Sequence, residues 1–166
     1  MDRRDILLGT AAAAASLGLP ATSQAQAKSL QDKLVGAWRL VDIYDKGKDG
    51  SQYYVWGEGV QGLAIYTSGG HFSRQIISAN RDKGASKTPR LPVGPSIGYF
   101  GTYTIDEATM TIKLKIDRCS FPSWDGVERV NKIALLTAEE LKTEGAVVHD
   151  PINGEVIPKA QYKRVG

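Results

Sequence analysis

The sequence predicts an all-β domain, built as a sandwich or as a barrel. About eight to ten short segments rich in β-branched and aromatic residues follow one another, and little of the chain has a helical pattern. Turn signals such as Ser68-Gly69-Gly70 separate these segments. Residues 109–116 alternate strictly, with Met110, Ile112, Leu114 and Ile116 on one face and Thr or Lys on the other. No internal repeat is present, which argues against a propeller or a solenoid.

Residues 1–27 are predicted to be a signal peptide. Arg3 and Arg4 precede an apolar run over residues 6–19, and small residues close the segment at Ala25-Gln26-Ala27. The paired arginines are typical of a twin-arginine signal, but acidic residues on either side of them depart from that motif, so the general secretory route remains open. The run is shorter than the roughly 20 residues that a bilayer span needs. We therefore expect cleavage, a periplasmic or secreted bacterial protein, and no stable membrane span afterwards.

Composition excludes several kinds of function. A formal charge of +3 is too small to indicate a nucleic-acid partner. Two histidines and one cysteine stand at no ligand spacing, so we expect no metal and no cofactor. Cys119 has no partner for a disulfide, and we expect a small buried side chain rather than a reactive thiol. No nucleophile elbow, phosphate loop or dinucleotide fingerprint is present.

The expected order along the chain is a linker or short helix over residues 28–33, followed by a β domain over residues 34–166. Its main strands are expected at residues 38–44, 53–56, 62–66, 71–78, 99–105, 109–116, 128–136, 140–144 and 156–165. Three prolines exclude a central strand from residues 79–97. A loop of this length is either a lid at a cavity mouth or a solvated connection, and the sequence leaves both open.

Four stretches of the sequence resemble stretches of known protein families. Residues 34–41, with Gly36 and Trp38, resemble the first strand of lipocalins and fatty-acid-binding proteins, in which Gly-x-Trp closes the base of a barrel. Residues 62–73, 99–106 and 120–126 are similar to further landmarks of a bacterial lipocalin-like domain family. The resemblance implies a closed or nearly closed antiparallel up-and-down barrel of about 8–10 strands. It also implies a cation from the last strand over Trp38, and Arg164 is preferred to Lys163 because guanidinium is planar.

Strand parity selects the side chains expected inside such a barrel. If Trp38 points inward, so do Leu40, Asp42 and Tyr44. The same rule selects Tyr99 and Tyr103 in their strand. Arg129 and Asn131 share a face with Ile133 and Leu135, whereas the opposite parity would place Arg129 in water. A buried cation needs a carboxylate, for which Asp42 and Asp117 are candidates, or an anionic ligand.

Three hypotheses about function follow. The first is a non-enzymatic protein that binds a small hydrophobic or amphipathic molecule through Arg129, Asn131, Tyr99, Tyr103, Asp42, Tyr54 and Trp56. Tyr54 and Trp56 are included because aromatic rings near a strand end often line a pocket mouth. The second is an isomerase or cyclase of a secondary metabolite, for which Tyr103, Asp42, Arg129 and His71 are the acid–base candidates. The third is a structural envelope protein without a ligand. The sequence leaves catalysis undecided and favours binding.

Overall fold

The computed structural model describes residues 29–82, 84, 88 and 94–166. The predicted signal peptide, residues 1–27, lies outside the described residues, as does part of the predicted loop 79–97. The described chain forms the elements α1 (Leu30–Leu34), β1 (Gly36–Gly47), β2 (Gln52–Tyr53), β3 (Gln61–Tyr66), β4 (His71–Ile77), β5 (Ser96–Asp106), β6 (Thr111–Cys119), the 3-10 helix η1 (Pro122–Trp124), β7 (Glu128–Leu136), β8 (Glu140–Glu144), β9 (Val148–Asp150) and β10 (Gly154–Val165).

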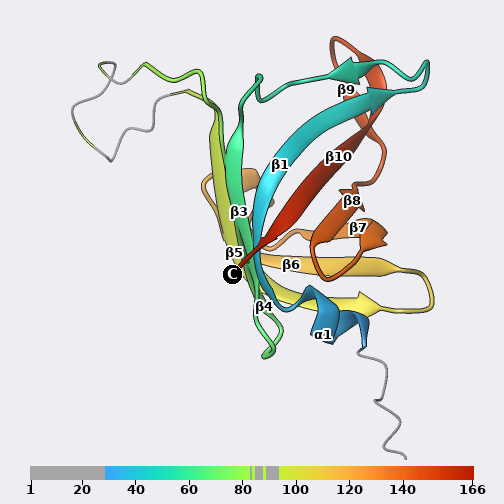
Figure 1. Cartoon of the computed structure of the whole chain (residues 1–166). Helices are drawn as coiled ribbons and strands as arrows, with labels where there is room; N and C mark the ends of the chain where they lie inside the picture. Colours follow the sequence, from blue (N-terminus) through green and yellow to red (C-terminus); the bar gives the residue numbers. More distant parts are fainter. Residues whose placement is uncertain (1–28, 83, 85–87, 89–93) are drawn as a thin grey trace, which may run out of the picture.

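The strands pair in one antiparallel sheet that closes on itself. Eight of them form a barrel in the order β1, β3, β4, β5, β6, β7, β8 and β10, and the pairing of β1 with β10 completes the ring. The short strands β2 and β9 extend β1 and β10 at the end opposite α1 (Figure 1). The predicted all-β fold, a closed up-and-down barrel, is therefore confirmed.

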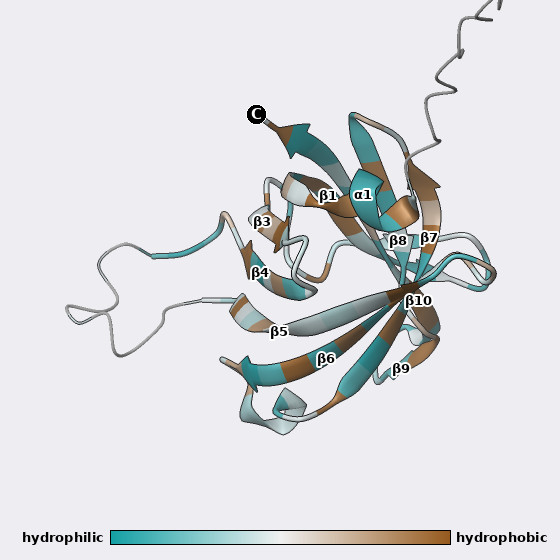
Figure 2. Cartoon of the chain, turned by 90° about the horizontal axis from the view of Figure 1, so that it is seen from below, coloured by the Kyte–Doolittle hydropathy of each residue, from teal (hydrophilic) through white to brown (hydrophobic). Residues whose placement is uncertain are grey.

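The alternation that predicted the strands also builds the core. In β6, Ile112, Leu114 and Ile116 are fully buried, while the lysines between them are exposed. Figure 2 shows this alternation as brown and teal bands along the strands. Met110 was expected on the same apolar face of this strand, and that prediction is wrong. The residue lies in the preceding turn with φ +53° and is 36% exposed. The alternating strand thus begins one residue later than its apolar pattern.

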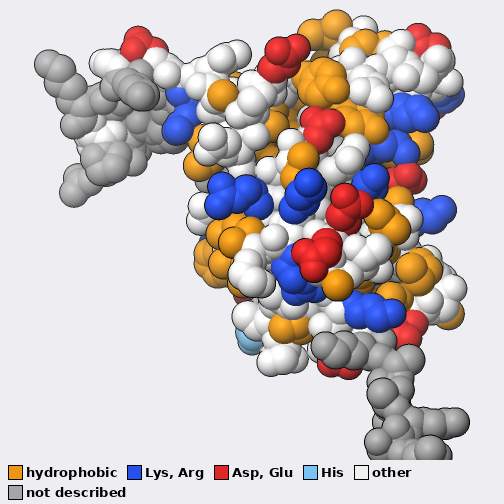
Figure 3. All heavy atoms as spheres, in the orientation of Figure 1, with side chains coloured by type: hydrophobic (Ala, Val, Ile, Leu, Met, Phe, Trp, Pro, Cys, Tyr) orange, Lys and Arg blue, Asp and Glu red, His pale blue; other side chains and the backbone are white. Residues whose placement is uncertain are grey.

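The outer surface carries charges of both signs. Figure 3 shows Lys and Arg side chains interspersed with Asp and Glu side chains over the face seen in Figure 1. In the described part of the chain, the helices are too short to traverse a bilayer; α1 has five residues.

Trp38 and Arg164 close the end of the barrel beside α1. Trp38 is fully buried, and its indole Nε1 donates to the carbonyl of Leu34 at 2.7 Å. The Cζ of Arg164 lies 4.1 Å from the centroid of the indole ring, which is the contact that the resemblance implied. The same guanidinium donates to three backbone carbonyls, those of Lys33, Val35 (2.8 Å) and Ala138 (2.5 Å). One side chain therefore ties the last strand to the first turn of the domain and to the β7–β8 turn.

Gly36 makes room for this arginine. Its φ of +136° lies in the region that favours glycine, and a Cβ at this position would stand 2.5 Å from Nη1 of Arg164. Both the backbone conformation and the approach of the guanidinium therefore require glycine two residues before Trp38.

The short helix α1 is fixed across the closed end. Ser29 and Asp32 form a capping box, in which each side chain accepts from the backbone N–H of the other. The backbone N–H of Leu30 donates to the carboxylate of Glu107 in the β5–β6 turn at 2.8 Å. Five residues would not hold a helix alone, so these contacts keep it over the base.

A bulge in β1 overturns the predicted parity of that strand. Leu40 pairs with Tyr162 and Asp42 pairs with Gln161, so Val41 is an extra residue without a partner on β10. Beyond the bulge, Ile43 and Asp45 face the interior in place of Asp42 and Tyr44. The inward orientation predicted for Asp42 is therefore wrong, because one inserted residue reverses the faces of all that follow.

The predicted strand over residues 53–56 is also corrected. Strand β2 ends at Tyr53, and the chain then passes through turns in which Gly57 and Gly59 take φ of +79° and +72°. Trp56 is half-buried in this segment, whereas Tyr54 is 42% exposed.

The closure of the base gives a first prediction. Arg164→Met should destabilise the protein by about 2–3 kcal/mol, because it removes charge-assisted hydrogen bonds to three carbonyls and the contact with Trp38. Lys163→Met is the matched control: it removes the same charge from the neighbouring exposed position and should change stability by less than about 0.5 kcal/mol. Urea unfolding followed by tryptophan fluorescence measures both. Equal effects of the two substitutions would contradict the role assigned to Arg164.

Candidate functional site

A cavity of about 370 Å³ lies in the half of the barrel away from Trp38. Its walls come from the barrel strands β1, β4, β5, β7, β8 and β10 and from the segments around Trp56, Trp124 and Val148. The lining residues are Ile43, Asp45, Val55, Trp56, Arg74, Ile76, Tyr99, Trp124, Arg129, Asn131, Thr143, Gly145, Val148, Pro158, Lys159 and Ala160. Apolar and aromatic side chains predominate, with a few polar groups among them, as is usual for sites that bind small molecules.

A chain of aromatic contacts leads from the mouth of the cavity into the barrel. Trp124 contacts Tyr99 edge-to-face at 5.7 Å between centroids, and Tyr99 contacts Phe72 in the same manner at 5.9 Å. Phe72 in turn stacks with Tyr66 at 6.4 Å. Aromatic pairs of this kind hold one another in defined orientations. They give one wall of the cavity a fixed shape.

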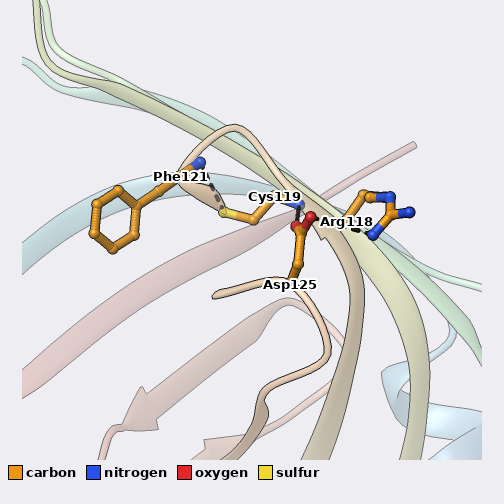
Figure 4. Close-up of polar contacts among 4 residues, drawn as sticks. All are labelled: Arg118, Cys119, Phe121 and Asp125. Carbon is orange, nitrogen blue, oxygen red and sulfur yellow. Dashed lines mark hydrogen bonds and ion pairs between the residues drawn. The ribbon is translucent and has the colours of Figure 1, made fainter. Parts of the chain in front are cut away.

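The corner between β6 and β7 carries Trp124 to the mouth of the cavity. Polar contacts of Asp125 and Cys119 hold this corner together (Figure 4). The carboxylate of Asp125 accepts from the backbone N–H of Cys119 at 2.7 Å and from Arg118 Nη1 at 3.2 Å. The backbone N–H of Phe121 donates to Sγ of Cys119 at 3.3 Å. Cys119 is half-buried and free, and it serves this corner as a hydrogen-bond partner. From the sequence, residues 120–126 were identified only as a stretch similar to the lipocalin-like family, and Trp124 was not predicted to belong to the site.

Arg129 and Asn131 both line the cavity, so the parity chosen for β7 holds from Arg129 to Ile133. A register shift between Ile133 and Leu135 then reverses the faces, so Leu136 rather than Leu135 packs against the core. Asn131 is buried. Neither carboxylate proposed for Arg129 meets it, since Asp42 faces outward and Asp117 is exposed. Instead, the Cζ of Arg129 lies 4.1 Å from the centroid of the Trp124 ring, a cation–π contact at the mouth.

Arg74 is a cavity residue that the sequence analysis missed. It is only 7% exposed and lies on β4 between Phe72 and Ile76, which also face inward. Its Nη1 donates to the hydroxyl of Tyr99 at 3.0 Å. The signal was present in the sequence, because the parity of Phe72 and Ile76 places Arg74 on the same face.

Two further charged groups line the cavity. Lys159 Nζ donates to the carboxylate of Glu144 at 2.5 Å, so its charge is paired. Asp45 reaches the cavity because of the bulge at Val41, and burial, with the nearby charge of Asp150, raises the pKa of its carboxyl above the usual value.

Other residues predicted for the site lie elsewhere. Tyr103 points into the barrel near its closed end, where its hydroxyl donates to the carbonyl of Thr67 at 2.7 Å, and it does not line the cavity. Tyr54 packs against Tyr44 at 5.9 Å between centroids, on the exposed side of the cavity wall. Trp56 and Tyr99, in contrast, do line the cavity.

The structure does not bring together the four acid–base residues considered for an isomerase. His71 is exposed at the start of β4, Asp42 faces outward, and the hydroxyl of Tyr103 is hydrogen-bonded at the closed end. Of the four, Arg129 alone lines the cavity.

Comparison with known families agrees with this geometry. The model of a lipocalin-like domain matches residues 35–162, which is most of the chain. The chain belongs to the lipocalin-like domain family. The matched range includes Trp38 and all the residues that line the cavity, whereas Arg164 lies two residues beyond its end. A search of curated proteins found no match.

Several solved structures resemble the lipocalin-like domain in fold. A redesigned beta barrel matches with a TM-score of 0.42 and 15% identity, over 82% of this chain and 95% of that one. Bovine odorant binding protein in complex with a selenium-containing odorant matches with a TM-score of 0.42 and 14% identity, over 85% and 76% of the two chains. The same bovine protein in complex with undecanal matches with a TM-score of 0.41 and 14% identity, over 84% of this chain and 75% of that one.

The raised pKa of Asp45 predicts a pH dependence of stability. A carboxyl whose pKa is higher in the folded state favours folding below its unfolded pKa, near 3.8, and loses that contribution as the pH rises through the folded pKa. Asp45→Asn should therefore match the wild type at about pH 3.5 and exceed its urea midpoint at pH 7. The gain should be small because the carboxyl is only half-buried.

Asp106→Asn is the control, and its effect on stability at pH 7 should have the opposite sign. Hydrogen bonding by the backbone of Thr109 lowers the pKa of Asp106, so this carboxylate favours folding above its unfolded pKa. Its replacement should lower the midpoint at pH 7. A midpoint for Asp45→Asn that stays below that of the wild type from pH 3.5 to pH 7 would contradict the burial cost assigned to Asp45.

Proposed function

We propose that this lipocalin-like domain binds a small hydrophobic or amphipathic molecule inside its barrel and does so outside the cytoplasm. The observation that carries the proposal is the cavity of about 370 Å³, walled by Ile43, Ile76, Tyr99 and Ala160 and bordered by Trp56 and Trp124. The base is plugged by Trp38 and Arg164, so a ligand enters from the opposite end.

The driving force is burial of apolar ligand surface. A ligand that buries about 250 Å² of apolar surface gains roughly 6 kcal/mol at 25 cal/mol per Å². This corresponds to a Kd in the tens of micromolar, which the asparagine and arginine side chains of the cavity can improve by orienting a polar group. The dispersal of His71, Asp42 and Tyr103 supports binding over acid–base catalysis.

An uncharged fluorescent probe tests the proposal. N-phenyl-1-naphthylamine should bind with a Kd on the order of 10 µM, with an increase in its fluorescence and quenching of tryptophan emission. Ala160→Phe should weaken this binding about tenfold or more, because Ala160 lines the cavity and the added ring occupies it. Ala134→Phe, the same substitution on the exposed face of β7, is the control and should leave the affinity unchanged.

Two results would count against the cavity as the binding site. One is the absence of probe binding to a folded wild-type protein. The other is equal affinity in the Ala160→Phe and Ala134→Phe variants, which would place the probe on the outer surface.

The extracytoplasmic part of the proposal rests on the pattern of residues 1–27. Expression of the full chain in a bacterium should yield periplasmic protein that starts at Lys28, as measured by intact mass. Replacing both Arg3 and Arg4 with lysine should stop export if the twin-arginine route is used and leave it intact if the general route is used. Full-length protein retained in the cytoplasm would contradict export.

A further inference from the structure

Arg74 is a buried cation at the inner end of the cavity. Among the described residues it is the only charged side chain in the buried core. It lies on β4 opposite Ala64 of β3 and Tyr99 of β5, well inside the ring of strands. Removing a guanidinium from water is costly unless an anion and several hydrogen-bond acceptors replace the water. The partners of Arg74 therefore decide what this residue does.

No carboxylate meets Arg74 in the described part of the chain. The ion pairs formed there are Lys48–Glu155, Arg118–Asp125 and Lys159–Glu144. One guanidinium nitrogen, Nη1, donates to the hydroxyl of Tyr99, whereas Nε and Nη2 are buried without a hydrogen-bond partner. The positive charge is thus inside the barrel without a counter-charge from the protein.

Tyrosines surround the guanidinium in place of carboxylates. Its Cζ lies 5.4 Å from the ring centroid of Tyr162 and 5.9 Å from that of Tyr99. The hydroxyls of Tyr66 and Tyr162 are buried without a hydrogen-bond partner. Burial raises the pKa of both hydroxyls, although the charge of Arg74 acts in the opposite direction. They therefore stay protonated, as neutral donors that do not cancel the charge.

Tyr99 connects this cluster with the cavity. Its oxygen accepts a hydrogen bond from Arg74, which leaves its own O–H free to donate, and both side chains line the cavity. A hydroxyl that accepts from a cation becomes a better donor. An acceptor atom in the cavity can therefore bind Tyr99 directly, and a small rotation of the guanidinium would offer it Nε or Nη2 as well.

We propose that the ligand is an apolar molecule with a single carboxylate, and that this carboxylate binds to Arg74 and the hydroxyl of Tyr99. The inference rests on the proposed function and specifies the chemistry of its ligand. At the inner end of the cavity, Arg74 carries one positive charge, which a carboxylate neutralises, whereas a phosphate monoester would bring surplus negative charge there. Arg129 lies at the mouth, against Trp124. The planar fork of N–H groups also fits the two oxygens of a carboxylate. The apolar part of the ligand then lies along Ile76 and Trp124 toward the mouth.

The test compares ligands that differ only in the polar group. Decanoate, 1-decanol and decyl phosphate are titrated into the wild-type protein at pH 8 in competition with N-phenyl-1-naphthylamine. Decanoate should bind at least about tenfold more tightly than 1-decanol, because a hydrogen bond to a charged group replaces one to a neutral group. Decanoate should also bind more tightly than decyl phosphate.

Variants identify the residues behind this preference. Arg74→Met should abolish the preference for decanoate while keeping the affinity for 1-decanol. Tyr99→Phe keeps the ring that contacts Phe72 and Trp124 and should reduce the preference several-fold. Arg39→Met removes an equal charge from the exposed face of β1, and Tyr103→Phe removes a hydroxyl that is hydrogen-bonded at the closed end. Both controls should keep the preference of the wild type.

The comparison of ligands in the wild type needs no substitution, and Tyr99→Phe tests the site even if Arg74→Met does not fold. Equal affinity for decanoate and 1-decanol would overturn the carboxylate site and leave the proposed function standing. Tighter binding of decyl phosphate, or a full preference for decanoate in Arg74→Met or Tyr99→Phe, would also overturn it. Absence of binding by all three ligands and by the probe would instead refute the proposed function itself.

Discussion

The contact of Arg164 with Trp38 is the constraint on which the rest of the barrel depends. Closure requires the first and last strands to meet, and they are far apart in the sequence, so their pairing costs more chain entropy than that of any neighbouring hairpin. The guanidinium stabilises this pairing from several sides, because it covers the indole and binds carbonyls of the α1 segment and the β7–β8 turn. A closed base then leaves one open end, and the cavity lies there.

The closed barrel could be predicted because its signals are local. Each strand shows its own alternation, each hairpin its own turn residues, and Gly36 and Trp38 stand two residues apart. The bulge at Val41 could not be predicted in the same way. It arises from the way in which β1 meets β10, and the sequence around it has neither glycine nor proline to mark it. That one residue explains why Asp42 was expected in the cavity and Asp45 was not.

Arg74 illustrates a different limit. Its inward orientation follows from the parity of β4, and the same reasoning that selected Arg129 would have found it. The absence of a carboxylate beside Arg74 could not be predicted from the sequence. It depends on which side chains of the other described strands point inward at the same level of the barrel. Trp124 belongs to the same class: the 3-10 turn that brings it over the mouth is fixed by Asp125, whose two partners lie on β6. Features of this kind can be identified only once the three-dimensional arrangement of the strands and turns is known.

Arg164 and Arg74 both use the hydrogen-bonding and cation–π contacts of a guanidinium, but with opposite consequences. Arg164 meets carbonyl oxygens at the rim and stabilises the fold, and glycine at position 36 clears space for it. Arg74 meets rings and neutral hydroxyls, which reduce the cost of burying its charge without cancelling it. A carboxylate from the protein beside Arg74 would stabilise the barrel more, but it would also satisfy the guanidinium and leave nothing for a ligand to neutralise. The proposed carboxylate site therefore depends on the presence of tyrosines, rather than aspartate or glutamate, around Arg74.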